Sequence, residues 1–270
     1  MNNKLNRLLA ERAELDRTLA DKLQKSILQE AIQGRLVPQD PTDEPVEKLL
    51  ERIRAEKKRL VAEGKLKAKD VTNSVIFIGA DNRHYEKIGK ETIDITDSIP
   101  FEIPDSWQWI RGKQMLLPME SKRPDGDYFT YIDVDAVNNK LHVIDNAKTI
   151  PVPNAPSRAN RKLHNGDVLF SMVRPYLKNI AMVDEEYCNA IASTGFYVLT
   201  PSVGVNPNYL FYMMLSSYVV DGLTRFMKGE NSPSINTIHI ENHLYPLPPY
   251  EEQQRIVAKV DELFAKIDGR

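Results

Sequence analysis

The sequence of 270 residues predicts a mixed α/β (α+β) domain flanked by long amphipathic helices. Residues 4–33 contain neither proline nor glycine, residues 100–248 contain several strand-like alternations, and residues 249–270 show a second helical periodicity. We therefore expect four parts. These are a helical region at 1–64, a connector at 65–99, an α/β domain at 100–248 and the start of another helix at 249–270.

The first helix has one apolar face. Its leucines and isoleucine recur at steps of seven or four residues, which is the spacing of one side of a helix: Leu8, Leu15, Leu19, Leu23 and Ile27. Gly34 ends the helix, and at ~1.5 Å per residue the segment is about 45 Å long. It either packs on its own domain or forms an arm that pairs with another helix. We favour the arm, for which the other end of the chain is a comparable partner.

A second helix is expected from Pro45 to Glu63, capped by Thr42 or Asp43 and ended by Gly64. It is rich in cations: Arg52, Arg54, Lys57, Lys58 and Arg59. A solvated face is the favoured interpretation, with contact to a nucleic-acid backbone as the alternative. The connector after it holds one expected strand, Val75–Ile78, and a turn at Gly79–Asn82.

The α/β domain is predicted from alternating apolar residues. The expected strands lie at 128–137, 141–145, 167–173, 178–183 and 195–199. One helix interrupts them, with Asn206 as its cap, Pro207 in its first turn and a buried face that reaches Val220. The final helix starts with Glu251 and Glu252, where the helix dipole favours carboxylates. Its apolar side follows helical spacing: Ile256, Val260, Leu263, Phe264 and Ile267.

Catalytic signatures are sparse. The sequence has no G-x-G-x-x-G, G-x-x-x-x-G-K-[ST] or H-E-x-x-H motif. Asp133 and Asp135 form a D-x-D on an expected strand, which places both carboxylates on one face, where they could hold Mg²⁺. We favour a solvent-facing surface and keep a metal-dependent nuclease as the alternative. We interpret Cys188 as structural and the pair His239 and His243 as packing in a loop or strand edge, and we expect neither cofactor nor metal.

Composition excludes several classes of protein. The chain has 36 Lys and Arg, 38 Asp and Glu, and one cysteine, which excludes a disulfide scaffold. No apolar run approaches the ~20 residues of a membrane span, and the N-terminus has no apolar stretch of signal-peptide length. We therefore expect a soluble, cytoplasmic protein.

Positive charge concentrates in one part of the α/β domain. Residues 140–178 hold seven Lys and Arg against two Asp, within a domain that is acidic overall. Lysine and arginine on loops, interleaved with Tyr and Asn, are the side chains that contact phosphates and base edges. The candidate nucleic-acid residues are Lys122, Arg123, Arg158, Arg161, Lys162, Arg174, Tyr176, Lys178, Lys228 and Asn231.

Several segments together resemble the specificity (S) subunit of type I restriction–modification systems. Residues 25–60 resemble the helical conserved region of that family, and IPFEIPDSWQWIRG (99–112) resembles the entrance to a target-recognition domain. GDVLFSMVRPYLKNIA (166–181) and ASTGFYVL (192–199) resemble its internal strands. PLPPYEEQQRIVAKVDELFAKID (246–268) resembles the exit into a conserved helix. No single motif is unique to the family, but their order and spacing are specific.

The resemblance implies a DNA-binding subunit without catalysis of its own. A whole S subunit has two target-recognition domains separated by two long helices, whereas this sequence predicts one such domain, so it resembles a half-sized or partial subunit. The implied partners are double-stranded DNA, methyltransferase (modification) subunits and a restriction/translocase subunit. The two terminal helices further suggest a homodimer.

Overall fold

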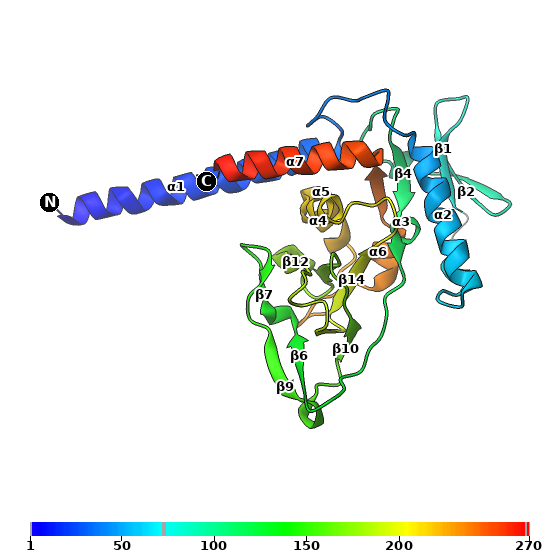
Figure 1. The fold of residues 1–270 in the computed structure, drawn as a ribbon. Helices are drawn as coiled ribbons and strands as arrows, with labels where there is room; N and C mark the ends of the chain where they lie inside the picture. Colours follow the sequence, from blue (N-terminus) through cyan, green and yellow to red (C-terminus); the bar gives the residue numbers. More distant parts are fainter. Residues whose placement is uncertain (1, 72–73, 268, 270) are drawn as a thin grey trace.

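The computed structural model describes the backbone of residues 2–71, 74–267 and 269, and the side chains of all of these except 2–5, 8–10 and 13. Two four-stranded sheets form the centre of the α/β domain, helices cover one of them, and helix α1 projects from the body as a long arm (Figure 1). Among the described helices, none is long and apolar enough to cross a membrane. Leu8 of the predicted apolar face lies outside the described side chains.

The first sheet has the strand order β10-β13-β6-β9 and the second has the order β12-β11-β14-β5. Only the pairing of β13 with β6 is parallel among the described pairs of these sheets. The strands are β5 (Leu116–Leu117), β6 (Tyr128–Ile132), β9 (Lys148–Pro151), β10 (Ala159–Lys162), β11 (Val168–Ser171), β12 (Ile180–Met182), β13 (Ile191–Ser193) and β14 (Phe196–Pro201). A small hairpin of β7 (Val137–Asn138) and β8 (Val143–Ile144) adjoins β12.

The second sheet is buried on both faces. Leu169 and Phe196 pack against Ile132 and Ala192 of the first sheet. Val168 and its neighbours on the opposite face pack under the helices. Every residue of β11 is buried, and its first three residues are apolar rather than alternating with polar ones.

Two helices cover the second sheet where the sequence predicted one: α4 (Pro207–Leu215) and α5 (Ser217–Thr224). The cap is as predicted, because the side chain of Asn206 accepts hydrogen bonds from the backbone N–H groups of Asn208 and Tyr209. The continuous helix to Val220 was wrong. Ser216 has extended backbone and its hydroxyl caps α5, so the chain turns between the two helices.

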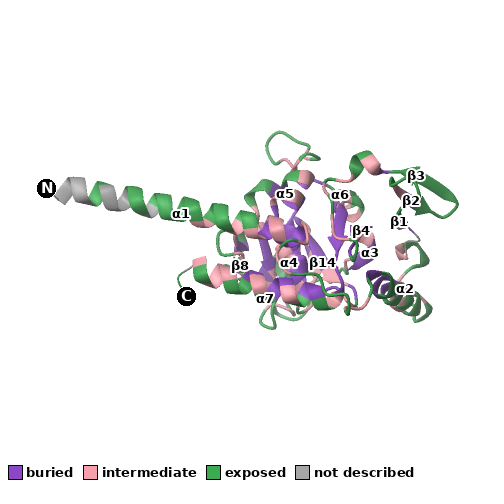
Figure 2. Cartoon of the chain, turned by 90° about the horizontal axis from the view of Figure 1, so that it is seen from above, coloured by how far each residue is buried: buried purple, intermediate pink, exposed green. Residues whose placement is uncertain are grey.

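Helices α1 (Asn2–Ile32) and α7 (Tyr250–Ile267) lie side by side and antiparallel (Figures 1 and 2). The expected partner at the other end of the chain is therefore present within the same chain. The body covers Ile256 and Val260 of α7, so this part of its stripe needs no second copy. Beyond the body, Leu15, Leu19 and Leu23 of α1 are 69%, 57% and 44% exposed.

Helix α2 (Val46–Ala62) matches its predicted bounds, but its cap and one of its cations differ from expectation. Pro45 is the N-cap residue, and Asp43 instead forms a two-pronged ion pair with Arg255 of α7, at 2.6 and 2.9 Å. Lys57, expected on a basic outer face, is only 3% exposed, and its ammonium donates to the carbonyl oxygens of Lys113 and Leu116.

The predicted connector is largely a three-stranded antiparallel sheet: β1 (Val75–Ile78), β2 (His84–Ile88) and β3 (Glu91–Asp94). Strand β1 and the Gly79–Asn82 turn are as predicted, whereas β2 and β3 were missed because their sequences are mostly polar. We call residues 75–94 the meander. Its Glu86 pairs with Arg111, N–O 2.6 Å, at the end of β4 (Gln108–Arg111), which pairs with β15 (Leu244–Leu247).

Aromatic rings fill the junction between the meander and the domain. Phe101 lies 5.1 Å from both Trp109 and Tyr218, measured between ring centroids. Trp109 is 2% exposed, and Trp107 is 5% exposed. Two short helices, α3 (Gly112–Met115) and α6 (Thr237–Asn242), contact each other nearby.

Candidate nucleic-acid interface

Four of the predicted residues lie on three neighbouring segments: Arg158, Arg174, Lys228 and Asn231. Arg174 joins two of the segments, because its backbone N–H donates to Pro233 O at 2.9 Å and its guanidinium donates to Asn231 O at 2.7 Å. Lys228 closes the same loop through two backbone hydrogen bonds with Ser234. We call residues 158, 174, 228 and 231 the basic cluster.

Arg158 is connected to this loop through the sheet. The carbonyl oxygen of Arg158 accepts from Thr194 N–H. The residue after Thr194 is Gly195, whose carbonyl oxygen accepts from Met172 N–H, just before Arg174. A Cβ atom on Gly195 would lie 3.0 Å from a guanidinium nitrogen of Arg158, so glycine leaves room for that side chain. The basic cluster is thus held by backbone hydrogen bonds and by the bond from the Arg174 guanidinium to Asn231 O.

The cations of the basic cluster remain available. Arg158, Arg174 and Lys228 are exposed, and none of the three forms an ion pair with any described residue. Arg174 has a left-handed backbone, with φ of 47°, which a residue with a side chain adopts at an energetic cost. Such strain persists where the surrounding structure fixes it, as the bond to Pro233 does here.

A second group of predicted cations is less available. Lys162 on β10 pairs with Glu120 at 2.6 Å, and the ammonium of Lys122 lies 3.9 Å from Asp125. Arg161 is half-buried, and burial lowers its pKa. Arg123 is exposed and forms no ion pair within the described part of the chain. Charge in this group is therefore partly neutralised by neighbouring carboxylates.

Tyr176 and Lys178 have other neighbours than the basic cluster has. They lie in the turn after β11, which contacts α5. The ammonium of Lys178 donates to Leu215 O at 2.9 Å, at the end of α4. Burial, and next the charge of Lys25 on α1, lower the pKa of Lys178. The ammonium of Lys178 is therefore directed to α4, whereas the guanidinium of Arg174, at the start of the same turn, bonds to the 228–234 loop.

The D-x-D pair does not form the carboxylate site that the nuclease alternative requires. Asp133 caps a short 3-10 turn rather than lying within a strand, and Asp135 pairs with Lys148 at 2.8 Å. Within the described residues, no group of three His, Cys, Asp or Glu side chains could hold a metal ion. The nuclease alternative has no support in this geometry.

The remaining reactive candidates have structural surroundings. Cys188 is half-buried, and its thiol contacts Glu185 O. The pair His239 and His243 was expected in a loop or strand edge, but His239 lies on α6 and His243 is the residue that caps its end. The ring of His239 stacks on Phe226, centroids 4.6 Å apart, so the two histidines do not present a joint ligand pair.

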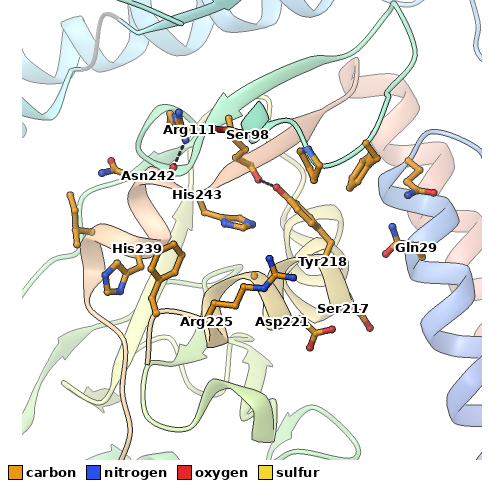
Figure 3. Close-up of a pocket in the computed structure, with 17 residues that line it drawn as sticks. Gln29, Ser98, Arg111, Ser217, Tyr218, Asp221, Arg225, His239, Asn242 and His243 are labelled. Atoms are coloured by element: carbon orange, nitrogen blue, oxygen red, sulfur yellow. Dashed lines mark hydrogen bonds between the residues drawn. The ribbon is translucent and has the colours of Figure 1, made fainter. Parts of the chain in front are cut away.

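A cavity of about 770 Å³ opens between α1, α5, α6 and residues 98–101 (Figure 3). Tyr218 and His243 line it, and burial, followed by the charge of Arg111, lowers the pKa of His243 to about 4. Arg225 at the rim is an exposed cation that the sequence patterns did not single out, because it stands alone on a helix end.

The comparisons with known proteins agree with this architecture. A family model described as the type I restriction modification DNA specificity domain matches residues 110–269. The specificity subunit of the Escherichia coli type I restriction enzyme EcoAI is 30% identical over 257 residues, covering 90% of this chain and 39% of that protein. The corresponding EcoEI subunit is 26% identical over 256 residues, covering 92% and 39%.

Solved structures show the same likeness. The HsdS subunit from Thermoanaerobacter tengcongensis superimposes with a TM-score of 0.59 at 37% identity, over 63% of this chain and 45% of that chain. A chain from a study of complex assembly and conformational transition of the type I R-M system gives 0.58 at 38% identity, over 62% and 44%.

The family match and the likeness to the solved structures define a restriction–modification specificity module, which here consists of the α/β domain and its flanking helices. This chain belongs to the type I restriction modification DNA specificity domain family. It spans about two fifths of the length of the curated relatives it matches.

Proposed function

We propose that this chain reads one half-site of a bipartite double-stranded DNA sequence and has no catalytic activity of its own. The basic cluster is the observation that supports this most directly. It offers two guanidinium groups and one ammonium group on loops held by the sheet, all exposed and none in an ion pair with a described residue. Both sheets carry these loops on a rigid support, which is what sequence readout requires.

Within the basic cluster the roles differ. The bond to Asn231 O fixes one nitrogen of the Arg174 guanidinium and leaves its other edge able to form the paired hydrogen bonds that recognise guanine. Lys228 is a mobile point charge suited to phosphate. We expect the more neutralised Lys162 to contribute less than its position in the sequence suggested.

The test is DNA binding by the full chain to its methylated target and to unrelated duplexes at several salt concentrations. Arg174→Ala should weaken specific binding by roughly 1–3 kcal/mol and relax the preference at one base pair. Lys228→Ala should weaken all sequences alike and reduce the slope of log affinity against log salt. Lys162→Ala serves as the matched control. The assignment fails if neither of the first two variants loses affinity at low salt.

We further propose that the helices assemble the complex. Two copies would pair through the exposed part of α1, and modification and restriction subunits would dock on the helices. The uncovered side chains of Leu15, Leu19 and Leu23 support this pairing, since such a stripe is typical of a helix with a partner. This assembly would act on DNA in the cytoplasm.

A further inference from the structure

A second exposed surface lies on the side of the domain from which α1 projects, where the labels β7, β8 and β12 appear in Figures 1 and 2. Leu141 and Val143 of the β7–β8 hairpin are 67% and 44% exposed, and Tyr176 and Leu177 of the turn after β11 are 48% and 40% exposed. The side-chain amide of Asn139 donates to Leu177 O at 2.9 Å, which joins the two loops. We call these four exposed residues the hairpin–turn patch.

The chemistry of the hairpin–turn patch is that of a protein contact. Exposed apolar side chains that gather on two adjoining loops, as these four do, are typical of interaction sites. The backbone supports the same interpretation. His142 and Lys178, one in each loop, have φ of 57° and 54°, and the described chain has just four such residues other than glycine. Strained backbone of this kind is retained mainly at functional sites.

Lysines surround the hairpin–turn patch. Lys178 adjoins it, and the charge of Lys25 on α1 is close enough to oppose that of Lys178. Lys140 sits at the tip of the hairpin, and neither it nor Lys25 forms an ion pair with a described residue. The one opposing carboxylate near Lys178 is Asp221 on α5, among the groups described. Asp145, at the end of the hairpin, accepts from the side-chain amide of Asn138, and the ammonium of Lys178 is bonded to Leu215 O. The exposed cations available to an incoming carboxylate are therefore Lys25 and Lys140.

We propose that the hairpin–turn patch docks an acidic protein segment with apolar side chains, and that the modification subunit carries this segment. The inference rests on the proposed function and deepens it. DNA offers phosphates for the lysines but no comparable surface for Leu141, Val143 and Leu177. Tyr176 and Lys178, which the sequence grouped with the DNA contacts, are assigned here to protein. Arg174, at the start of the same turn, bonds instead to the 228–234 loop.

The experiment is a calorimetric titration of the full chain with the purified modification subunit of the same system. The double variant Leu141→Ser and Leu177→Ser should bind at least about tenfold more weakly, because two apolar side chains no longer become buried. Lys140→Glu should weaken binding at low salt and have less effect at high salt. The matched control is Ile88→Ser with Ile93→Ser, two comparably exposed residues of the meander, which should leave the affinity unchanged.

The DNA affinity of the same variants shows whether the hairpin–turn patch binds protein or DNA. The Leu141 and Leu177 variant should bind half-site DNA as the wild type does. The proposal is overturned if this variant binds the modification subunit normally, if it loses DNA affinity instead, or if the wild-type chain has no affinity for that subunit. Failure of the proposed function gives a different result: the wild-type chain then binds no DNA, while the titration with the subunit still decides the role of the patch.

Discussion

Lys57 is buried although the sequence around it predicts an exposed, basic helix face. It lies among the cations of α2, yet its side chain is buried and its ammonium donates to two backbone carbonyl oxygens, at 2.7 and 2.6 Å. Burial, together with the charge of Lys113, lowers its pKa from 10.5 to about 8. Both carbonyls lie around α3 and β5, so Lys57 connects α2 to the entrance of the central domain.

The lowered pKa predicts a pH-dependent stability. Between about pH 8 and 10.5 the unfolded chain holds a proton on Lys57 that the folded chain has lost, so the free energy of unfolding should rise with pH in this window. Urea unfolding at several pH values measures it. Lys57→Met should remove this contribution, and Lys58→Met, on the exposed side of α2, should retain it. Equal pH slopes for wild type and Lys57→Met would contradict the assignment.

At this scale the sequence predicts local hydrogen bonds well and burial of charges poorly. The cap at Asn206 depends on residues two and three positions away, and it was predicted. Lys57 and the partly buried Arg161 depend on segments far along the chain, which no local pattern reveals. The basic cluster shows the same division. Its cations were identifiable, whereas the bond from Arg174 to Asn231 spans 57 positions.

Among the elements, the meander is attached to the domain by one ion pair and by the packing of Ile76 against Trp109. Glu86 is 4% exposed, and it accepts from the guanidinium of Arg111 and from the hydroxyl of Ser74. Arg111 also donates to Asn242 O beside α6. A single arginine therefore connects the meander, β4 and α6.

Removal of the carboxylate charge should loosen the meander. In Glu86→Gln the half-buried guanidinium of Arg111 loses its anion and keeps its bond to Asn242 O, so the cost should be below the roughly 3–5 kcal/mol of a fully buried pair. We expect faster proteolysis within residues 79–94 and a lower urea midpoint, both followed by gel and circular dichroism. The control is Lys87→Gln, on the exposed side of the same strand. Protection of the meander equal to that of the wild type would argue against this role.

Elements with a strong apolar pattern were predictable, and those held by tertiary contacts were not. Strands β11, β12 and β14 and helices α1, α2 and α7 match their expected positions closely. The strand expected at 128–137 begins as predicted, but β6 ends at Ile132, where Asp133 caps a 3-10 turn. Strands β2 and β3 lack an apolar run, and their sheet is held by pairing with β1 and by Arg111. The break at Ser216 was missed because the residues on both sides of it share one apolar periodicity.

For the whole molecule, the antiparallel packing of α1 and α7 determines which helix surfaces stay exposed for pairing with a second chain. The body already covers the first half of α7, whereas α1 continues beyond it with an uncovered stripe. A pair of chains would therefore meet mainly through α1. Leu263 and Phe264 of α7 are half-buried, and Phe264 packs on Tyr212, so changes there also disturb the chain's own packing.

We expect the chain to be a dimer at micromolar concentration and the double variant Leu15→Asp and Leu19→Asp to be a monomer, as measured by light scattering. Both residues are exposed in the single chain, so the melting of the central domain should not change. Arg17→Asp places the same side chain on another side of α1 and should remain dimeric. A monomeric wild-type chain at high micromolar concentration would rule out the pairing.

Two-fold pairing also predicts the form of the DNA target. Each chain would read one short half-site, so the recognised sequence should contain two inverted copies. The helices, about 46 Å and 27 Å at ~1.5 Å per residue, would set a non-specific gap between the copies. Co-expression with the modification subunit and mapping of methylated adenines tests this. An asymmetric bipartite motif would mean that the chain pairs with a different half.

The two tryptophans of the sequence occupy separate junctions, so their fluorescence reports on the unfolding of each junction. Trp109 lies with Phe101 and Tyr218 under the meander, and Trp107 lies near Gly34, after the arm. Their indoles are shielded from water, so each should emit at short wavelength in the intact chain. Single-tryptophan variants would therefore show, by the order of their red shifts during unfolding, whether the meander or the arm separates first from the sheets.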